Sequence, residues 1–205
     1  MKSFRICMQN IRKWGSNSRI KMCLIMSFLF VYSYISGMWK IIPLVGEKMN
    51  PWIFPFLFCW RFMKIVFMAP IVFIFCDAPF IDSNQSYVML RTSRKKWCFG
   101  QVLYIYAGSV IYAFVLFFST IIINIGHIKW GTSWGKVLGS AGTSTVLSTL
   151  GINYTTVKVP TIVIRYYTPA QAMFFSFLLM VLSFIFIGLL IYTVNVITKT
   201  NVAGT

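Results

Sequence analysis

The sequence is short of acidic side chains and of histidine. Its 205 residues include three acids, Glu47, Asp77 and Asp82, and one histidine, His127. Acid–base catalysis needs several titratable groups that converge on one place. We therefore expect that the protein is not an enzyme, that it has no catalytic residues, and that it binds no metal or cofactor itself.

Cysteines are few and scattered. The five of them show neither a C-x-x-C pair nor the spacing of zinc ligands. A structural disulfide framework is therefore not expected. The cysteines are interpreted as small apolar side chains near the ends of helices.

The scarcity of acids leaves the chain with a large uncompensated charge. Its 19 Lys and Arg residues give a formal net charge of +16, and 58% of its residues are hydrophobic. Ion pairs within the chain cannot neutralise this excess, so the counter-charge must come from outside. Because the basic residues flank apolar runs of membrane length, anionic lipids are the expected partners, and nucleic acid is not.

Long apolar runs dominate the rest of the sequence. Three runs without a charged residue cover residues 22–38, 102–125 and 170–196. Each has about the length that a transmembrane helix needs. A fourth run, residues 52–76, is long enough but contains two basic residues and two prolines. We predict an all-α integral membrane protein with about four transmembrane helices in a single transmembrane domain, residues 1–205.

The distribution of basic residues predicts the orientation of these spans. Lysine and arginine gather in residues 1–20 and in the loop 77–100, and such clusters favour the cytoplasm. The cations of loop 126–168 are spread over a long segment, so that loop is expected outside. We expect a multi-pass protein of the cell membrane with both termini in the cytoplasm. A cleaved signal peptide is the alternative for the start, but the first apolar run ends without an A-x-A-like site.

Residues 1–20 have the pattern of an amphipathic helix lying on a membrane surface. Apolar side chains recur at helical spacing between Phe4 and Trp14, and basic side chains lie among them. The alternative is that this helix packs against another protein. The residues expected at the membrane surface, including one tryptophan of the aromatic belt, are Arg5, Arg12, Lys13, Lys95, Lys96 and Trp97.

Arg61 and Lys64 are two cations inside the fourth apolar run. On a helix they lie one turn apart, and a cation at the centre of a bilayer costs about 2.5–3.5 kcal/mol on insertion scales. Either the helix is displaced, so that both side chains reach the outer interface, or the pair lines an intramembrane polar site that attracts an anionic group.

The loop after the fourth run, "CDAPFIDSNQSYVMLRTSRKKWCFGQ", predicts a short helix. Asp82 and Gln85 are spaced as at a helix start, and Tyr87 and Leu90 supply apolar positions. Ser93 can cap the next helix, which would carry the basic residues into the third span.

This layout resembles the N-terminal four-span portion of the permease (transmembrane) subunits of type-2 ATP-binding-cassette exporters. The likeness rests on the basic amphipathic start, the second span ending in "CDAPF", and "LRTSRKKW" before the third. In that family the short cytoplasmic helix is a coupling helix that docks into a separate ATPase subunit. The resemblance implies that the docking residues here are Asp82, Ser83, Gln85, Tyr87, Leu90, Arg91 and Arg94.

The resemblance also implies a function and partners. The chain would move a substrate out of the cell, while a partner ATP-binding subunit binds and hydrolyses ATP. Because the family usually has six spans, the resemblance further implies a homo- or hetero-oligomer with another permease chain, or a longer protein. The alternative function is a small membrane immunity or regulatory protein without transport activity.

The stretch "GTSWGKV" is similar to a phosphate-binding loop but lacks its spacing. Three residues instead of four separate Gly131 from Gly135, and Val137 follows Lys136 where Ser or Thr is required. We interpret it as part of a polar external loop.

Overall fold

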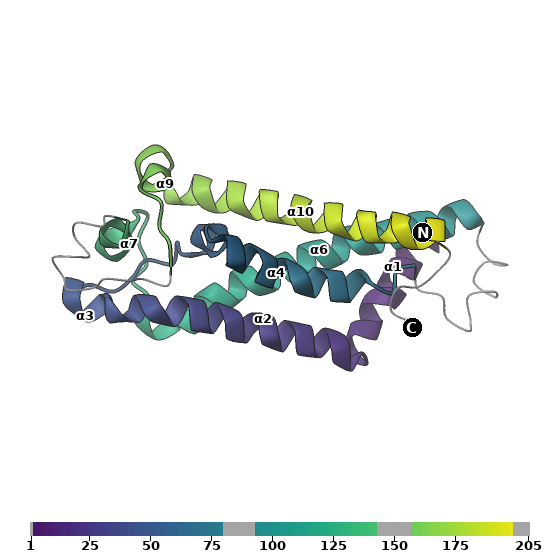
Figure 1. Ribbon diagram of the computed structural model, residues 1–205, viewed down its shortest axis with the longest axis horizontal. Coiled ribbons are helices and arrows are strands. Elements are labelled where there is room, and N and C mark those ends of the chain that lie inside the picture. Colours follow the sequence, from purple (N-terminus) through teal and green to yellow (C-terminus); the bar gives the residue numbers. More distant parts are fainter. Residues whose placement is uncertain (1, 80–92, 143–156, 199–205) are drawn as a thin grey trace. The chain divides into compact units, whose positions relative to one another are not determined.

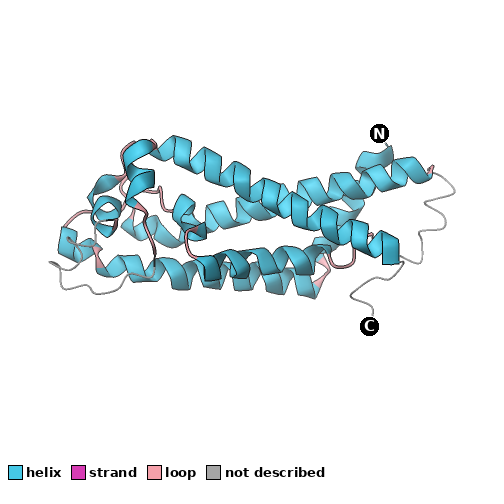
Figure 2. Ribbon diagram, turned by 45° about the horizontal axis from the view of Figure 1, so that its top comes forward, coloured by secondary structure: helices cyan, strands magenta, loops and turns pink. Residues whose placement is uncertain are grey.

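The computed structural model describes residues 2–79, 93–142 and 157–198. Within these ranges the chain is helical, and Figure 2 shows helices and loops without a strand. One isolated backbone bridge joins Met49 to Ile128. The predicted all-α class is thus confirmed for the part of the chain that the structure describes.

Three helical segments are long and apolar enough to cross a membrane, by length and composition: Ser18–Val45, Arg94–His127 and Pro169–Thr198. Their main helices are α2 (Ser18–Ser36), α6 (Arg94–Asn124) and α10 (Pro169–Thr198), labelled in Figure 1. Each contains most of one of the charge-free runs predicted from the sequence. Apolar runs of this length form helices because a bilayer offers the backbone no other hydrogen-bond partners.

The fourth apolar run does not form one continuous helix. A 3-10 helix, η3 (Phe54–Phe58), comes first, and α4 (Arg61–Phe75) begins after it. Pro55 lies in η3, where its ring removes a backbone donor. With 15 residues, α4 is shorter than the roughly 20 residues that cross a bilayer. A fourth span is therefore not confirmed.

The chain divides into two compact units. Unit 1 comprises Met1–Ile25, Met68–Phe114 and Val181–Thr205, and unit 2 comprises Met26–Phe67 and Val115–Met180. Helices α2, α6 and α10 each contribute residues to both units.

The core of unit 1 is built around Phe75, which is fully buried at the end of α4. A Cβ atom added at Gly108 of α6 would lie 3.1 Å from its ring, and one at Gly188 of α10 would lie 2.9 Å from it. The ring of Tyr104 meets Phe75 edge-on, with centroids 5.7 Å apart. Glycine at these two positions therefore allows α6 and α10 to approach Phe75 closely.

Helix α1 (Lys2–Arg12) packs along the first turns of α6 within unit 1. The Ser3 hydroxyl donates to the Lys96 carbonyl at 2.9 Å, and the Asn10 side-chain amide donates to Gln101 at 3.1 Å. Trp14, in the 3-10 turn η1 (Lys13–Gly15), donates its indole N–H to the Tyr104 hydroxyl at 2.8 Å. One face of the predicted amphipathic helix thus lies on its own chain.

Unit 2 carries most of the short helices. They are η2 (Gly37–Lys40), α3 (Ile42–Val45), η3, η4 (Ile125–His127), α7 (Gly135–Ala141) and α9 (Thr161–Tyr166). Buried Asn50 connects the segment after α3 with the segment before α7, because its side-chain amide donates to the Ser133 carbonyl. The indole of Trp52 donates to the Gly131 carbonyl at 2.8 Å.

The glycines of "GTSWGKV" serve this packing. A Cβ atom at either Gly131 or Gly135 would lie 3.1 Å from the Asn50 side chain, and Gly135 has a φ of +73°. L side chains rarely adopt that conformation. The motif therefore has a structural explanation in the contact with Asn50.

Gly135→Ala is expected to lower the free energy of unfolding by about 1–2 kcal/mol, because alanine is strained at positive φ and meets Asn50. The measurement is denaturation by SDS in mixed micelles, followed by circular dichroism. Gly139→Ala in the same helix is the control, because a Cβ there meets no atom within 4 Å. Equal stability of the two variants would contradict the explanation.

Candidate functional site

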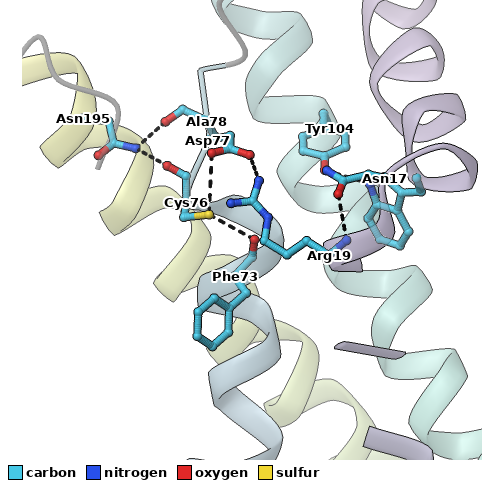
Figure 3. A network of polar contacts seen from close by, with 9 residues as sticks. Asn17, Arg19, Phe73, Cys76, Asp77, Ala78, Tyr104 and Asn195 are labelled. Atoms are coloured by element: carbon cyan, nitrogen blue, oxygen red, sulfur yellow. Dashed lines mark hydrogen bonds and ion pairs between the residues drawn. The ribbon is translucent and has the colours of Figure 1, made fainter. Parts of the chain in front are cut away.

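The candidate site lies in unit 1, where the chain leaves α4. Asn195 in the last turns of α10 is 3% exposed, and its amide donates to the carbonyls of Cys76 at 2.9 Å and Ala78 at 2.6 Å. Figure 3 shows this pair of hydrogen bonds from one side chain to the segment after α4. Buried carbonyls need such partners because they have lost water, so the end of α4 is held to α10.

An ion pair holds the same segment to α2. Arg19, in the first turn of α2, pairs with Asp77, which lies between the two carbonyls that Asn195 binds. The side chains are 38% and 29% exposed, so solvent screens part of their attraction. The Asn17 side chain accepts the Arg19 backbone N–H at 3.0 Å, as Figure 3 also shows. Residues 76–78 are therefore held by two helices at once.

The start of α6, which follows residues 80–92, is also anchored. Helix α6 begins at Arg94, and the Ser3 hydroxyl of α1 donates to its third residue, Lys96. Trp97 is 8% exposed, and its backbone N–H donates to the Ser93 carbonyl at 3.1 Å. Contacts from α1, α2 and α10 thus fix both flanks of residues 80–92. We call residues 76–78 and 93–97 the loop anchors.

The predicted docking residues fall almost entirely between these anchors. Six of them lie outside the described residues: Asp82, Ser83, Gln85, Tyr87, Leu90 and Arg91. The seventh, Arg94, is the first residue of α6 and is exposed.

Most of the residues predicted at the membrane surface expose their charges. Arg5, Arg12, Lys95 and Lys96 are exposed, and Lys13 is half-buried. The side chain of Trp97 is buried within unit 1, and its place in an aromatic belt stays a prediction. Burial of this indole was not visible in the sequence, where the neighbouring cations indicated an interface.

Arg61 and Lys64 lie in the first turn of α4, and both are exposed. Both interpretations drawn from the sequence, the displaced helix and the intramembrane polar site, stay predictions. The structure adds a third cation. The ammonium of Lys158 lies 6.0 Å from the ring centroid of Trp60, the residue before Arg61.

The remaining acid of the described residues, Glu47, has its partner in unit 2. Glu47 accepts a hydrogen bond from Lys136 at 2.7 Å in unit 2. That bond lowers the pKa of Glu47 and raises the pKa of Lys136. The contribution of this ion pair to the free energy of unfolding is present above the pKa that the Glu47 carboxyl has in the unfolded chain. It is lost as the pH falls through the pKa of the carboxyl in the folded chain. Solvent exposure keeps the contribution small.

The described residues contain no metal-binding cluster. Within the ranges that the structure describes, no three His, Cys, Asp or Glu side chains are placed to hold a metal ion. Burial raises the pKa of the Cys7 thiol, which disfavours its reactive thiolate form.

Comparison with known proteins adds no relative to this description. No family model matches the chain, and neither a curated protein nor a solved structure matches it. The resemblance to exporter permeases therefore stays a prediction from the sequence.

Proposed function

We propose that this chain is a membrane-spanning permease subunit of an ATP-binding-cassette export system, which moves its substrate with a separate ATPase subunit. Residues 82–94 would be the docking element for that ATPase. ATP would bind to the partner, and the chain would associate with another permease chain.

The anchoring of the loop flanks is the observation that carries this proposal. A docking element transmits movement only if its ends are held firmly to the helices that must move. Here Asn195 and Arg19 hold the end of α4 to α10 and α2, and Ser3 holds the start of α6 to α1. A displacement of residues 80–92 would therefore act on several helices at once. A loop that only reverses the chain direction does not need such contacts.

The charge distribution supports a cytoplasmic position for this loop. Arg94, Lys95 and Lys96 are exposed where α6 begins, beside the loop. Basic residues next to a span favour the cytoplasm, where an ATPase subunit finds ATP.

Replacing Tyr87 and Leu90 with aspartate is expected to abolish co-purification of an ATPase while membrane insertion persists. Two carboxylates on an apolar docking face stay desolvated and unpaired, and hot-spot residues of this kind cost about 2 kcal/mol or more each. The measurement is affinity purification of the tagged chain from its native membrane, with identification of Walker-motif proteins by mass spectrometry.

The matched control is Ile162→Asp, which places a carboxylate on an exposed isoleucine of α9 in unit 2, outside the three candidate spans. It should leave ATPase recovery unchanged. Unchanged recovery with the double variant would reject docking at this loop. Absence of any ATPase with the wild-type chain would favour the immunity or regulatory function instead.

A further inference from the structure

Three cations gather at the beginning of α4 in unit 2. The Lys158 ammonium lies over the ring of Trp60, at the distance of a cation–π contact. Arg61 follows Trp60 directly, and Lys64 completes the first turn of α4. The sequence placed only Arg61 and Lys64 in one group, and the structure brings Lys158, from the segment before α9, to Trp60, the residue that precedes Arg61. We call Trp60, Arg61, Lys64 and Lys158 the α4 cation cluster.

No carboxylate of unit 2 balances this cluster. The sequence of unit 2 contains one acid, Glu47, and Glu47 pairs with Lys136. The first turn of α4 adds the positive end of the helix dipole. Every charge contributed by protein at this place is thus positive, and the complementary ligand is an anion.

The apolar surroundings restrict what kind of anion fits. Phe62 and Ile65 alternate with the cations along α4, and their side chains are 56% and 68% exposed. A small hydrated anion would leave these surfaces in water. A ligand with an anionic head and an apolar tail would cover both kinds of side chain.

We propose that the α4 cation cluster binds the phosphate headgroup of one anionic lipid molecule, whose acyl chain lies against Phe62 and Ile65. Lys158 and Arg61 contact the phosphate from two different segments, and Trp60 holds the Lys158 side chain between them. If the bound lipid is also the transported substrate, the substrate class is an anionic, phosphate-bearing amphiphile. That reading rests on the proposed permease function. As a binding site the cluster needs no ATPase.

The test uses the full chain purified in an uncharged detergent and titrated with phosphatidylglycerol, with phosphatidylcholine as the net-neutral comparison. Native mass spectrometry counts the bound lipid molecules. We expect one phosphatidylglycerol retained in preference to phosphatidylcholine. Because solvent-exposed charge pairs are weak, Lys158→Gln should weaken binding about threefold and Arg61→Gln with Lys64→Gln about tenfold.

Two control variants separate a site from general charge attraction. Lys48→Gln removes one exposed cation elsewhere in unit 2, and it should bind as the wild type does. Lys158→Arg keeps the charge over Trp60, and it should also bind normally. Equal weakening by Lys48→Gln and Lys158→Gln would overturn the proposal. All these side chains are exposed, so each variant is expected to fold. A monodisperse profile in size-exclusion chromatography checks this.

Inorganic phosphate decides between a lipid and a free anion. At equal concentration it should displace little phosphatidylglycerol, since it cannot cover Phe62 and Ile65. If inorganic phosphate displaced bound phosphatidylglycerol as effectively as added phosphatidylglycerol does, the cluster would be assigned to a free anion and the lipid proposal would be overturned. Loss of lipid binding in these experiments leaves ATPase co-purification unaffected, so the site and the permease function can fail separately.

Discussion

Phe75→Ala is expected to lower the free energy of unfolding by about 3–5 kcal/mol, the range for removing a buried phenylalanine ring. Phe75 is fully buried, and helix glycines at 108 and 188 are fitted against its two sides. Neighbouring backbone cannot move inward to fill the space, because helices α6 and α10 continue beyond the contact. The ring of Tyr104 would lose its edge-on partner as well.

The measurement is SDS denaturation in mixed micelles, followed by the far-ultraviolet circular dichroism of the helices. Phe73→Ala is the matched control, since Phe73 lies on the same helix and is 54% exposed. It should cost about 1 kcal/mol or less, as surface substitutions do. A similar loss in both variants would show that Phe75 is not the centre of the unit 1 core.

Asn195→Leu is expected to lower the free energy of unfolding by about 2–3 kcal/mol and to release the segment after α4. Leucine has nearly the same size but cannot donate to the carbonyls of Cys76 and Ala78. A buried polar group left without a partner costs about 1–3 kcal/mol, and this substitution removes the donor from the buried Ala78 carbonyl and from the part-buried Cys76 carbonyl. The direction is the same at any pH, because an amide does not titrate.

A second readout reports on the anchor itself. The Cys76 thiol is half-buried and donates to the Phe73 carbonyl at 3.1 Å. In a variant that keeps Cys76 as its only cysteine, Asn195→Leu should speed labelling of this thiol by a maleimide. Thr193→Val is the control, because the Thr193 hydroxyl bonds only within its own helix, to Leu190. Unchanged labelling after Asn195→Leu would mean that Asn195 does not hold the segment.

Local sequence patterns were sufficient for the long helices. The charge-free runs predicted α2, α6 and α10, because length and hydropathy are properties of a continuous stretch. The start of α10 also has a local sequence signature. Thr168 and Gln171 exchange the two hydrogen bonds of a capping box, at 3.2 and 3.4 Å. Pro55 marked a point where the fourth run would break, but the length of α4 did not follow from it.

Local sequence patterns did not predict the contacts between distant segments. Asn195 binds Cys76 across 119 residues of sequence, and nothing in "YTVNV" distinguishes this asparagine from one at a helix end. Lys158 lay in an external loop with no visible relation to Trp60. The indole of Trp97 was assigned to the membrane interface because of its basic neighbours, and packing within unit 1 buries it.

The sequence alone therefore determined a helical chain with three spans of membrane length and a cationic excess, since composition and periodicity act locally. Tertiary structure decided which polar side chains anchor the loop and which cations meet at α4. Those pairings join segments that are far apart in sequence. In unit 1 they accompany the close packing of α6 and α10 on Phe75, which glycines 108 and 188 allow. A single sequence does not specify such distances, because each polar residue has many partners that would satisfy it equally well.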